Sequence, residues 1–363
     1  MSRRPAERLT LAFASLLFGV ASAGVATAAT PAQMQAIVQT GMGGPEVLQL
    51  RTVPVLSPGP GQVLIKVYAA AVNPVDWGMR QPREGAAPTI GVAANARIPG
   101  FDVAGVIEKV GPGVTSHRVG DAVFSMIGRI RTDGLNGGYA EYVIAPEQNT
   151  VAKPAAMTFA QAAGLGTVGM TAARTLAAAK VGAGTRLFVN GISGGVGSTV
   201  AQIAKARGAY VIGTASARHH DYLKSLGVDE IIDYRSVAFE TVVRNVDAVI
   251  DTVSAEGATR GVKVVKRGGV LVSIAGNPPA ADCAAAGIDC PGPGSMREMD
   301  GRGGSEGDYL REAAAVAASG KLAIHVDATF PLAHAGEAQE ENRNGGTQGK
   351  IILIVNAAEA GRR

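Results

Sequence analysis

The chain has 363 residues, of which 47% are hydrophobic, 18% charged and 4% aromatic, and its formal net charge is +4 at pH 7. This length predicts about two domains, because a single hydrophobic core stops growing at about 250–300 residues. Like charges do not occur in runs of five or six, and no basic stripe is interleaved with aromatic residues. This pattern argues against a nucleic-acid partner.

The first 29 residues have the pattern of a signal peptide. A basic segment with Arg3, Arg4 and Arg8 precedes an apolar stretch at 9–20, and small residues typical of a cleavage site follow. An uncleaved membrane anchor is the alternative, but the apolar stretch is short for a span, and no later segment is long and apolar enough. We therefore expect an exported protein, periplasmic or secreted, and the Arg3-Arg4 pair leaves the twin-arginine route open.

The following part of the chain, up to about residue 157, predicts a β-rich, barrel-like domain. Short runs rich in Val and Ile are separated by Gly/Pro turns and show almost no helical periodicity. The predicted strands cover 34–40, 62–72, 103–110 and 122–127.

From about residue 158, strands and helices alternate, as in parallel strands joined by helical crossovers. The near-continuous Val/Ile character of these strands fits a sheet that is covered on both faces. The segment 277–307 is polar and rich in Gly and Pro, so we expect an irregular insertion there. The predicted strands are 186–190, 209–214, 230–234, 246–253, 268–276, 323–330 and 350–355, and the predicted helices lie near 195–207, 217–226 and 309–319.

The only two cysteines, Cys283 and Cys290, fall in this insertion. Neither belongs to a CxxC pair, and no Cys/His cluster has zinc spacing. A disulfide, which an oxidising compartment would allow, and two free thiols are equally compatible with the sequence.

The motif NGISGGVG at 190–197 follows a buried-type strand and opens a helix with one apolar side. Glycines let a phosphate approach the main chain, and the free N–H groups at a helix start stabilise it. A second strand follows at the right distance, so the context predicts a dinucleotide-binding loop, although the spacing differs from G-x-G-x-x-G. The alternative is a tight turn without a ligand.

The end of that second strand, GTASARHH at 213–220, bears on the choice of cofactor. NAD sites usually have an acidic residue here that binds the ribose 2′-hydroxyl, and this stretch has none. Ser216 and Arg218 suit a 2′-phosphate, which favours NADPH over NADH. The alternative for Arg218 is a solvated residue at a helix start.

Taken in order, the motifs resemble those of the medium-chain dehydrogenase/reductase superfamily, in particular the zinc-independent quinone oxidoreductase branch that includes zeta-crystallin. The resemblance covers essentially the whole mature chain. It rests on AAAVNPVDWGMR (69–80), IPGFDVAGVIEKVGPGV (98–114), GGYAEY (137–142), GTVGMTA (166–172), NGISGGVG (190–197), GTASARHHDYLKSLGVDEIIDY (213–234) and GKIILIV (349–355).

This resemblance implies an α/β fold with two domains and NADPH bound in the cleft between them. A GroES-like, β-rich catalytic domain would comprise 34–157 and 320–358. A Rossmann domain with a doubly wound parallel sheet would comprise 158–319 and carry the insertion. The family also implies a homodimer joined through the edge of the Rossmann sheet.

The resemblance also implies site residues. Asn73 and Tyr139 are the candidate catalytic donors to a developing oxygen anion, although Tyr139 and Tyr142 also suit a packing role. The implied cofactor-binding residues are Asn73, Thr167, Gly191, Ser193, Gly194, Gly195, Val196, Ser216, Arg218, Tyr234, Val253, Ile274, Ala275 and Lys350.

Both zinc sites of the superfamily are missing from the sequence. Zinc enzymes carry Gly-His-Glu where this chain has Gly100-Phe101-Asp102, and Asp76 stands roughly where a first-ligand cysteine would be. We expect Asp76 to be a turn or interface carboxylate. Without a Lewis acid, alcohol oxidation is hard, so the resemblance implies hydride transfer to a quinone or an α,β-unsaturated carbonyl.

No residue stands out as a general acid, so solvent can supply the proton. The five histidines form no recognisable triad or metal set, and we expect surface or loop positions for all of them: His117, His219, His220, His325 and His334. Two other functions stay open, namely an enoyl or other carbonyl reductase and an exported NADP(H)-binding protein with little turnover.

Overall fold

The computed structural model of the protein describes residues 30–81, 96–128, 134–292 and 304–363. The predicted signal peptide at 1–29 lies outside these residues. The chain from Ala32 to Arg363 forms one unit. Within the described ranges, no helix combines the length and the apolar character that a bilayer span requires.

Strands from both ends of the described chain form the larger sheet. They are β3 (Gln62–Val72), β4 (Asp102–Val110), β5 (Ala122–Met126), β6 (Tyr142–Pro146), β7 (Thr150–Ala152), β13 (Val326–Pro331) and β14 (Lys350–Ile354). The strand order is β13-β14-β3-β4-β5-β7, and β6 also pairs with β3. A separate antiparallel hairpin consists of β1 (Gln33–Gln39) and β2 (Leu48–Pro54).

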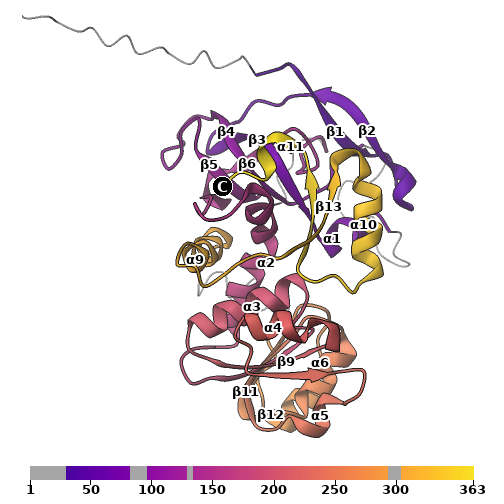
Figure 1. Ribbon diagram of the computed structural model, residues 1–363, viewed down its shortest axis with the longest axis vertical. Coiled ribbons are helices and arrows are strands. Elements are labelled where there is room, and N and C mark those ends of the chain that lie inside the picture. Colours follow the sequence, from indigo (N-terminus) through magenta and orange to yellow (C-terminus); the bar gives the residue numbers. More distant parts are fainter. Residues whose placement is uncertain (1–29, 82–95, 129–133, 293–303) are drawn as a thin grey trace, which may run out of the picture. The chain divides into compact units, whose positions relative to one another are not determined.

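The last strands of the chain complete a sheet that its first half begins. β14 pairs antiparallel with β3, with Ile351 opposite Val72, and β13 runs parallel to β14. In Figure 1 the yellow C-terminal strands accordingly lie among the violet N-terminal ones. This pairing agrees with a catalytic domain built from two segments, although the limits 34–157 and 320–358 stay a prediction.

The second sheet is entirely parallel. It consists of β8 (Arg186–Asn190), β9 (Tyr210–Ala215), β10 (Glu230–Asp233), β11 (Val246–Asp251) and β12 (Val265–Ser273). The strand order is β10-β9-β8-β11-β12. From β8 the chain adds β9 and β10 on one side, and then crosses over to add β11 and β12 on the other side, as in a Rossmann-type sheet. Ligands of such sheets bind beyond the carboxyl ends of the strands, where the direction reverses.

Both faces of the parallel sheet are buried, as the Val/Ile-rich strands predict. Within β8, Leu187 and Val189 belong to one hydrophobic cluster, whereas Phe188 belongs to another on the opposite face. The first cluster continues into α2 (Phe159–Ala178), α3 (Gly195–Ala206) and α9 (Glu306–Ala318). The second includes residues of α5 (Phe239–Val242), α6 (Ala255–Val262) and α7 (Ala280–Ala286).

Several elements differ from the sequence-based expectation. The predicted helix at 217–226 is a 3₁₀ turn, η3 (Ala217–His219), followed by α4 (His220–Ser225). Helix α10 (Ala335–Asn344) was not predicted, because its sequence AGEAQEENRN is too polar to show an apolar period. The remaining short elements are α1 (Pro74–Gly78), α11 (Ala357–Ala360), η1 (Pro45–Val47), η2 (Glu147–Asn149) and η4 (Leu332–His334).

The segment 277–307 contains regular structure as well as irregular chain. Its helix α7 carries Cys283, which forms a disulfide with Cys290. Between them, residues Gly287 and Asp289 hydrogen-bond to the outer edge of β12. The disulfide, which the sequence left undecided, therefore closes a short turn, and the hydrogen bonds of Gly287 and Asp289 join this turn to the edge of the parallel sheet. Residues 293–303 lie outside the described residues.

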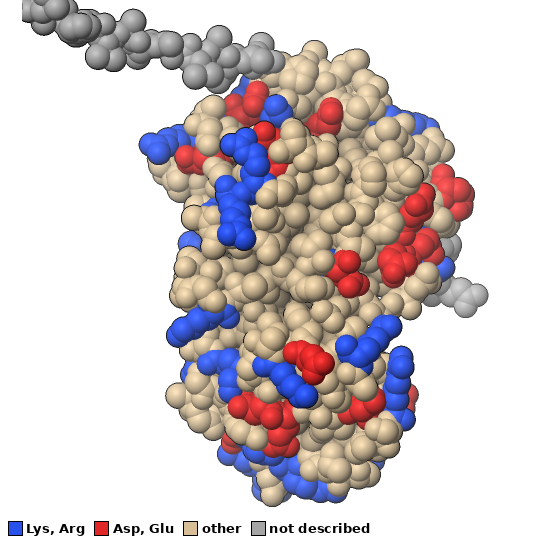
Figure 2. Space-filling model, viewed as in Figure 1, with Lys and Arg blue, Asp and Glu red and all other residues tan. Residues whose placement is uncertain are grey.

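Charged side chains are mixed on the molecular surface. On the face shown in Figure 2, Lys and Arg form small groups between groups of Asp and Glu, and broad uncharged areas separate them. On this face, the described residues form no continuous basic band of the kind that tracks a phosphate backbone.

Candidate functional site

The glycine loop connects β8 to α3 at the carboxyl end of β8. The strand order of the parallel sheet reverses between β8 and its neighbour β11. Gly191 has φ = +81°, in the left-handed region. A Cβ at this position would lie 2.6 Å from Thr252 Oγ1 and 2.7 Å from Val253 Cγ2. Both the main-chain conformation and the close approach of the loop after β11 therefore require glycine at 191.

The start of α3 is open toward the loop. Gly194 is the N-cap residue, and a Cβ there would meet only Gly191 O, at 3.8 Å. By contrast, a Cβ on Gly197 would lie 2.3 Å from Gly191 O, so glycine at 197 allows the helix to pack on the loop. The N–H groups of the first turn and the positive end of the dipole of this 12-residue helix suit a diphosphate.

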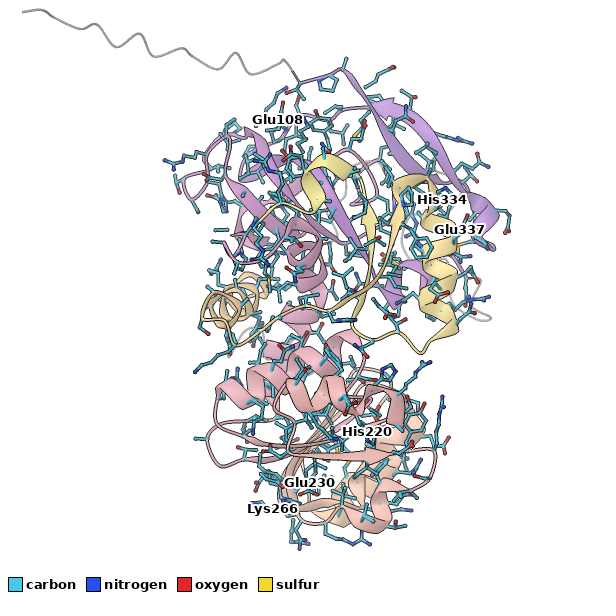
Figure 3. The ribbon with its side chains drawn as sticks, in the orientation of Figure 1. Glu108, His220, Glu230, Lys266, His334 and Glu337 are labelled. Atoms are coloured by element: carbon cyan, nitrogen blue, oxygen red, sulfur yellow. A yellow bond between two sulfur atoms is a disulfide. The ribbon has the colours of Figure 1, made fainter. Side chains whose placement is uncertain are left out.

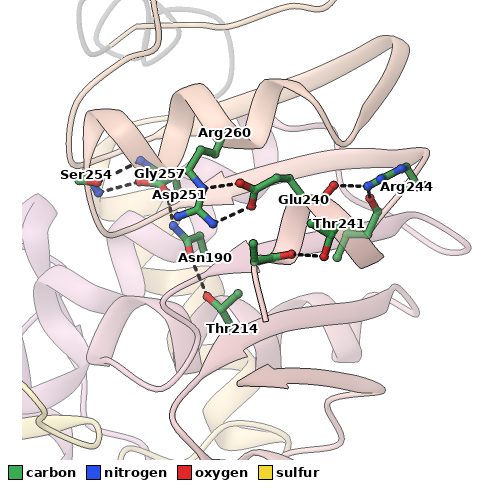
Figure 4. A network of polar contacts seen from close by, with 11 residues as sticks. Asn190, Thr214, Glu240, Thr241, Arg244, Asp251, Ser254, Gly257 and Arg260 are labelled. Carbon is green, nitrogen blue, oxygen red and sulfur yellow. Dashed lines mark hydrogen bonds and ion pairs between the residues drawn. The ribbon is translucent and has the colours of Figure 1, made fainter. Parts of the chain in front are cut away.

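A buried polar network holds the loop in position (Figure 4). Asn190, the last residue of β8, donates from Nδ2 to Asp251 Oδ2 at 2.6 Å and accepts from Thr214 Oγ1 at 2.6 Å. The Thr214 hydroxyl oxygen in turn accepts from the main-chain N–H of Gly191 at 3.0 Å. The ends of β8, β9 and β11 are thereby joined, and the loop conformation is set before any ligand binds.

The residues predicted to select NADPH lie beyond β9 and β10. Ser216 is 4% exposed, Tyr234 is 56% exposed and Arg218 is exposed. The Arg218 guanidinium donates to Gly346 O at 2.8 Å. The Arg218 side chain borders an open cavity of about 400 Å³, and Tyr234 does not line this cavity. The lining residues are Arg218, His219, Asp327, Glu341, Gly345, Gly346, Thr347 and Gln348.

Three further predicted residues lie at the carboxyl ends of β11 and β12, beside the glycine loop. Val253 is 56% exposed, Ala275 is exposed and Ile274 is half-buried. The main-chain N–H of Ile274 donates to Asp251 O at 3.0 Å, which joins the two strand ends. These residues therefore border the same edge of the sheet as Gly191 and the start of α3.

Strand β14 brings Lys350 underneath the glycine loop. The main-chain N–H of Gly349 donates to Ser193 O at 3.2 Å. A Cβ on Gly195 would lie 2.9 Å from Lys350 Cδ and 3.2 Å from Val168 Cγ1. Glycine at 195 therefore makes room for the Lys350 side chain. Val196, the next residue of α3, is half-buried.

The amine of Lys350 belongs to a buried polar cluster, which we define as Asn73, Asp102, Thr167 and Lys350. Lys350 Nζ donates to Asn73 Oδ1 at 2.6 Å and to Val72 O at 2.7 Å. Asn73 Nδ2 donates to Asp102 Oδ2 at 2.8 Å. The main-chain N–H and the hydroxyl of Thr167 both donate to Asp102 Oδ1, each at 2.8 Å.

The charges of the cluster are buried. Burial raises the pKa of Asp102, while the Lys350 charge and the hydrogen bonds from Asn73 and Thr167 oppose this rise. Burial likewise lowers the pKa of Lys350, against the attraction of Asp102 and Asp76. The opposite charge on the far side of the Asn73 amide thus acts against the effect of burial on both groups.

A second buried acid adjoins this cluster. Asp76 lies in the first turn of α1 and is 1% exposed, so it is a core residue rather than an interface carboxylate. Its Oδ2 accepts from Asn73 N at 2.8 Å and from the Tyr139 hydroxyl at 2.9 Å, whereas Oδ1 has no partner among the described residues. Burial raises the pKa of Asp76 to about 7. Tyr139 is completely buried, in agreement with a packing role.

The histidines do not converge on a site. His220 begins α4, and His334 lies beside Glu337 at the start of α10, with Nδ1 and Oε1 2.9 Å apart (Figure 3). The expectation of surface or loop positions is wrong for His219, which is 7% exposed. Its ring contacts Arg218 Nε and Gln348 Oε1, because η3 packs against the loop before β14.

Comparisons with known proteins match both parts of the chain. A family model described as "Alcohol dehydrogenase GroES-like domain" matches residues 59–155, and one described as "Zinc-binding dehydrogenase" matches 226–353. An NADPH-dependent alkenal/one oxidoreductase of Arabidopsis thaliana is 34% identical, with 90% of this chain and 81% of the relative covered. A quinone oxidoreductase of Sus scrofa is 30% identical, with 89% and 98% covered.

Solved structures agree with these relatives. The quinone oxidoreductase from Coxiella burnetii has a TM-score of 0.78 at 30% identity, with 89% of this chain and 99% of that chain covered. An alcohol dehydrogenase superfamily protein from Novosphingobium aromaticivorans has a TM-score of 0.77 at 34% identity and the same coverage. The chain belongs to the medium-chain dehydrogenase/reductase superfamily. It falls in the quinone oxidoreductase-like branch and is a pyridine-nucleotide-dependent oxidoreductase.

The residues of this medium-chain reductase do not fit a zinc ion. The side chain of Phe101 cannot ligate a metal, and both oxygens of Asp102 already accept hydrogen bonds. The Lys350 ammonium next to them would repel a cation. No group of three or more His, Cys, Asp or Glu residues with ligand geometry occurs in the described ranges.

Two buried acids of the candidate site, Asp102 and Asp76, were not predicted as functional residues from the sequence. Asp102 was considered only as a replacement for a zinc ligand, and Asp76 was expected to be a turn or interface carboxylate. Two signals were available in the sequence. Asp102 directly precedes the apolar run VAGVI, and Asp76 lies between Val75 and Trp77. Burying a carboxylate is costly, so an acid in such a context indicates a specific partner.

Proposed function

We propose that the protein is a zinc-independent, NADPH-dependent reductase that transfers hydride to a quinone or to an α,β-unsaturated carbonyl. The observation that carries this proposal is the glycine-lined start of α3, which lies at the reversal point of the parallel sheet and directly over Lys350. The relatives named for alkenal/one and quinone reduction support the substrate class. The lack of an acid after β9 and the position of Arg218 support NADPH.

In this proposal each part of the site has a separate task. The first turn of α3 binds the diphosphate, and Arg218 binds the 2′-phosphate. NADPH, when bound, supplies the hydride. Asn73 and Thr167 contact the nicotinamide end, and this role leaves no N–H of Asn73 for a developing oxygen anion, because the main-chain N–H donates to Asp76 and one hydrogen of Nδ2 to Asp102. We assign Tyr139 to holding Asp76, because its hydroxyl donates to that carboxyl, and the proton comes from solvent.

The function is tested with the mature protein, NADPH and two acceptors, a simple quinone and an enone. We expect the absorbance of the reduced cofactor to fall with both acceptors, and to fall equally after dialysis against a metal chelator. Tight NADPH binding without turnover would identify an exported nucleotide-binding protein instead. Loss of activity on chelation would contradict zinc independence, and failure to bind NADPH would contradict the proposal altogether.

The Arg218→Ala variant is expected to discriminate between the two cofactors. It should weaken NADPH binding by about 1–2 kcal/mol, the value of a hydrogen bond to a charged group, and leave NADH binding unchanged. Isothermal titration calorimetry with both cofactors measures the difference. The matched control is Arg244→Ala. Arg244 lies just before β11, at the amino ends of the parallel strands, whereas Arg218 lies beyond their carboxyl ends. Equal losses for NADPH and NADH in Arg218→Ala would contradict this assignment.

We further propose that the protein is exported and, as the family resemblance implies, forms a homodimer. The basic–apolar–small pattern of the leader supports export, and a disulfide is typical of oxidising compartments. Mass spectrometry of protein from the periplasmic fraction should give a chain without the leader and without alkylatable thiols. Full-length chain with two free thiols would contradict export.

A further inference from the structure

The partners of Asn73 determine the direction in which its amide points. An ionised carboxylate only accepts hydrogen bonds, and an ammonium only donates them. The two ends of the Asn73 amide lie 2.8 Å from Asp102 Oδ2 and 2.6 Å from Lys350 Nζ. The nitrogen must therefore face Asp102 and the oxygen must face Lys350. The second N–H bond of Nδ2 has no hydrogen-bond partner among the described residues.

The same carboxylate determines what Thr167 can offer. Its hydroxyl has a single hydrogen, and this hydrogen is donated to Asp102 Oδ1 at 2.8 Å. The hydroxyl oxygen can then only accept a further hydrogen bond. Thr167 as a whole is half-buried. Asp102 thereby makes one neighbour a donor and the other an acceptor.

The cluster lies next to the loop that we propose binds the diphosphate. Lys350 Cδ and Val168 Cγ1 would both contact a Cβ on Gly195, the first residue of α3. The arrangement is also tightly fitted, since a Cβ on Gly166 would lie 2.4 Å from Asp102 Oδ1. Glycine at 166 therefore lets the carboxylate reach the main chain of α2.

One N–H donor beside one hydroxyl acceptor matches a primary carboxamide, which has a C=O and an NH₂ group. We propose that Asp102 is a positioning residue that sets Asn73 and Thr167 to bind the carboxamide of the nicotinamide ring, an inference that rests on the proposed function. Turning the ring by half a revolution about its glycosidic bond moves the carboxamide to the other side. Asp102 thus determines which face of the ring donates the hydride.

The Asp102→Asn variant tests the proposal sharply. Its amide oxygen can still accept from Thr167, but its new NH₂ group would face Asn73 Nδ2, so that two donors oppose each other. We expect NADPH to bind about 10-fold more weakly by calorimetry, whereas the fragment 2′-phospho-ADP-ribose, which lacks the ring, binds as in the wild type. With NADPH deuterated at either C4 position, wild type should transfer from one face, and Asp102→Asn from both.

Two further variants control the experiment. Asp247→Asn is a matched carboxylate-to-amide change at the amino end of β11, away from the glycine loop, where the Asp247 carboxylate accepts from Arg186 N at 2.7 Å. This variant should leave the ratio of the two affinities unchanged. If Asp102→Asn does not fold, Thr167→Val carries the test, since it keeps the main-chain N–H and removes the acceptor. Thr167→Ser should restore binding.

The outcomes separate this inference from the proposed function. Equal weakening of NADPH and of the fragment in Asp102→Asn, or unchanged binding with hydride still leaving from one face, would overturn the positioning role alone. A wild-type protein that does not bind NADPH would overturn the proposed function, and with it this inference.

Discussion

The Gly194→Val variant is expected to fold normally and to bind NADPH at least about 100-fold more weakly than the wild type, a loss of about 2.7 kcal/mol. Gly194 has φ = −71° and ψ = 172°, which suit any residue, and a Cβ there meets only Gly191 O at 3.8 Å. The valine side chain would therefore not disturb the core, but would fill the space in front of the α3 N–H groups. Calorimetry with NADPH measures the loss.

The control for this variant is Gly182→Val. Gly182 precedes β8 at the opposite end of the same strand, and a Cβ there meets nothing within 4 Å. Both variants should unfold within about 2 °C of the wild type, because neither removes a packed group. If Gly194→Val binds NADPH as well as Gly182→Val does, the loop is not the diphosphate site.

The Asp76→Asn variant should change the pH dependence of stability. The pKa of Asp76 rises from 3.8 to about 7 on burial, so the wild type loses stability as the pH rises from about 4 to 7. The amide cannot ionise and can still accept from Asn73 N and the Tyr139 hydroxyl. Relative to the wild type, the variant should therefore gain about 2–3 kcal/mol between pH 5 and pH 8.

Urea unfolding at pH 5 and pH 8 measures this gain. Asp308→Asn is the matched control, because the pKa of Asp308 is lowered to about 2 by Arg311 and Ser305. That carboxylate is ionised in both states throughout the interval, so its replacement should have the same effect at both pH values. A pH-independent difference between Asp76→Asn and the wild type would show that Asp76 is ionised in the folded protein.

Local sequence was sufficient to predict most strands and the dinucleotide loop. β3 and β8 have the predicted limits, because runs of Val and Ile between turn residues identify a buried strand wherever it lies in the fold. The glycine loop was recognisable because its function depends on neighbouring residues in the chain. Elements whose stability depends on packing were missed, and α10 is the clearest example.

The disulfide also required the tertiary structure. Cys283 and Cys290 are seven positions apart, a spacing compatible with pairing or with two free thiols. Helix α7 and the hydrogen bonds of Gly287 and Asp289 to β12 bring the two side chains together.

By itself, the sequence determined the class of this protein, its parallel sheet and its glycine loop, since each depends on residues that are close in the chain. Only the tertiary structure decided the buried cluster of Asn73, Asp102, Thr167 and Lys350. The antiparallel pairing of β3 with β4 and β14 brings the end of one strand to the starts of the other two, with Asp102 opposite Ala71 and Ile351 opposite Val72. A strand's register depends on its partner, so no single segment of the sequence predicts that these charged residues come together.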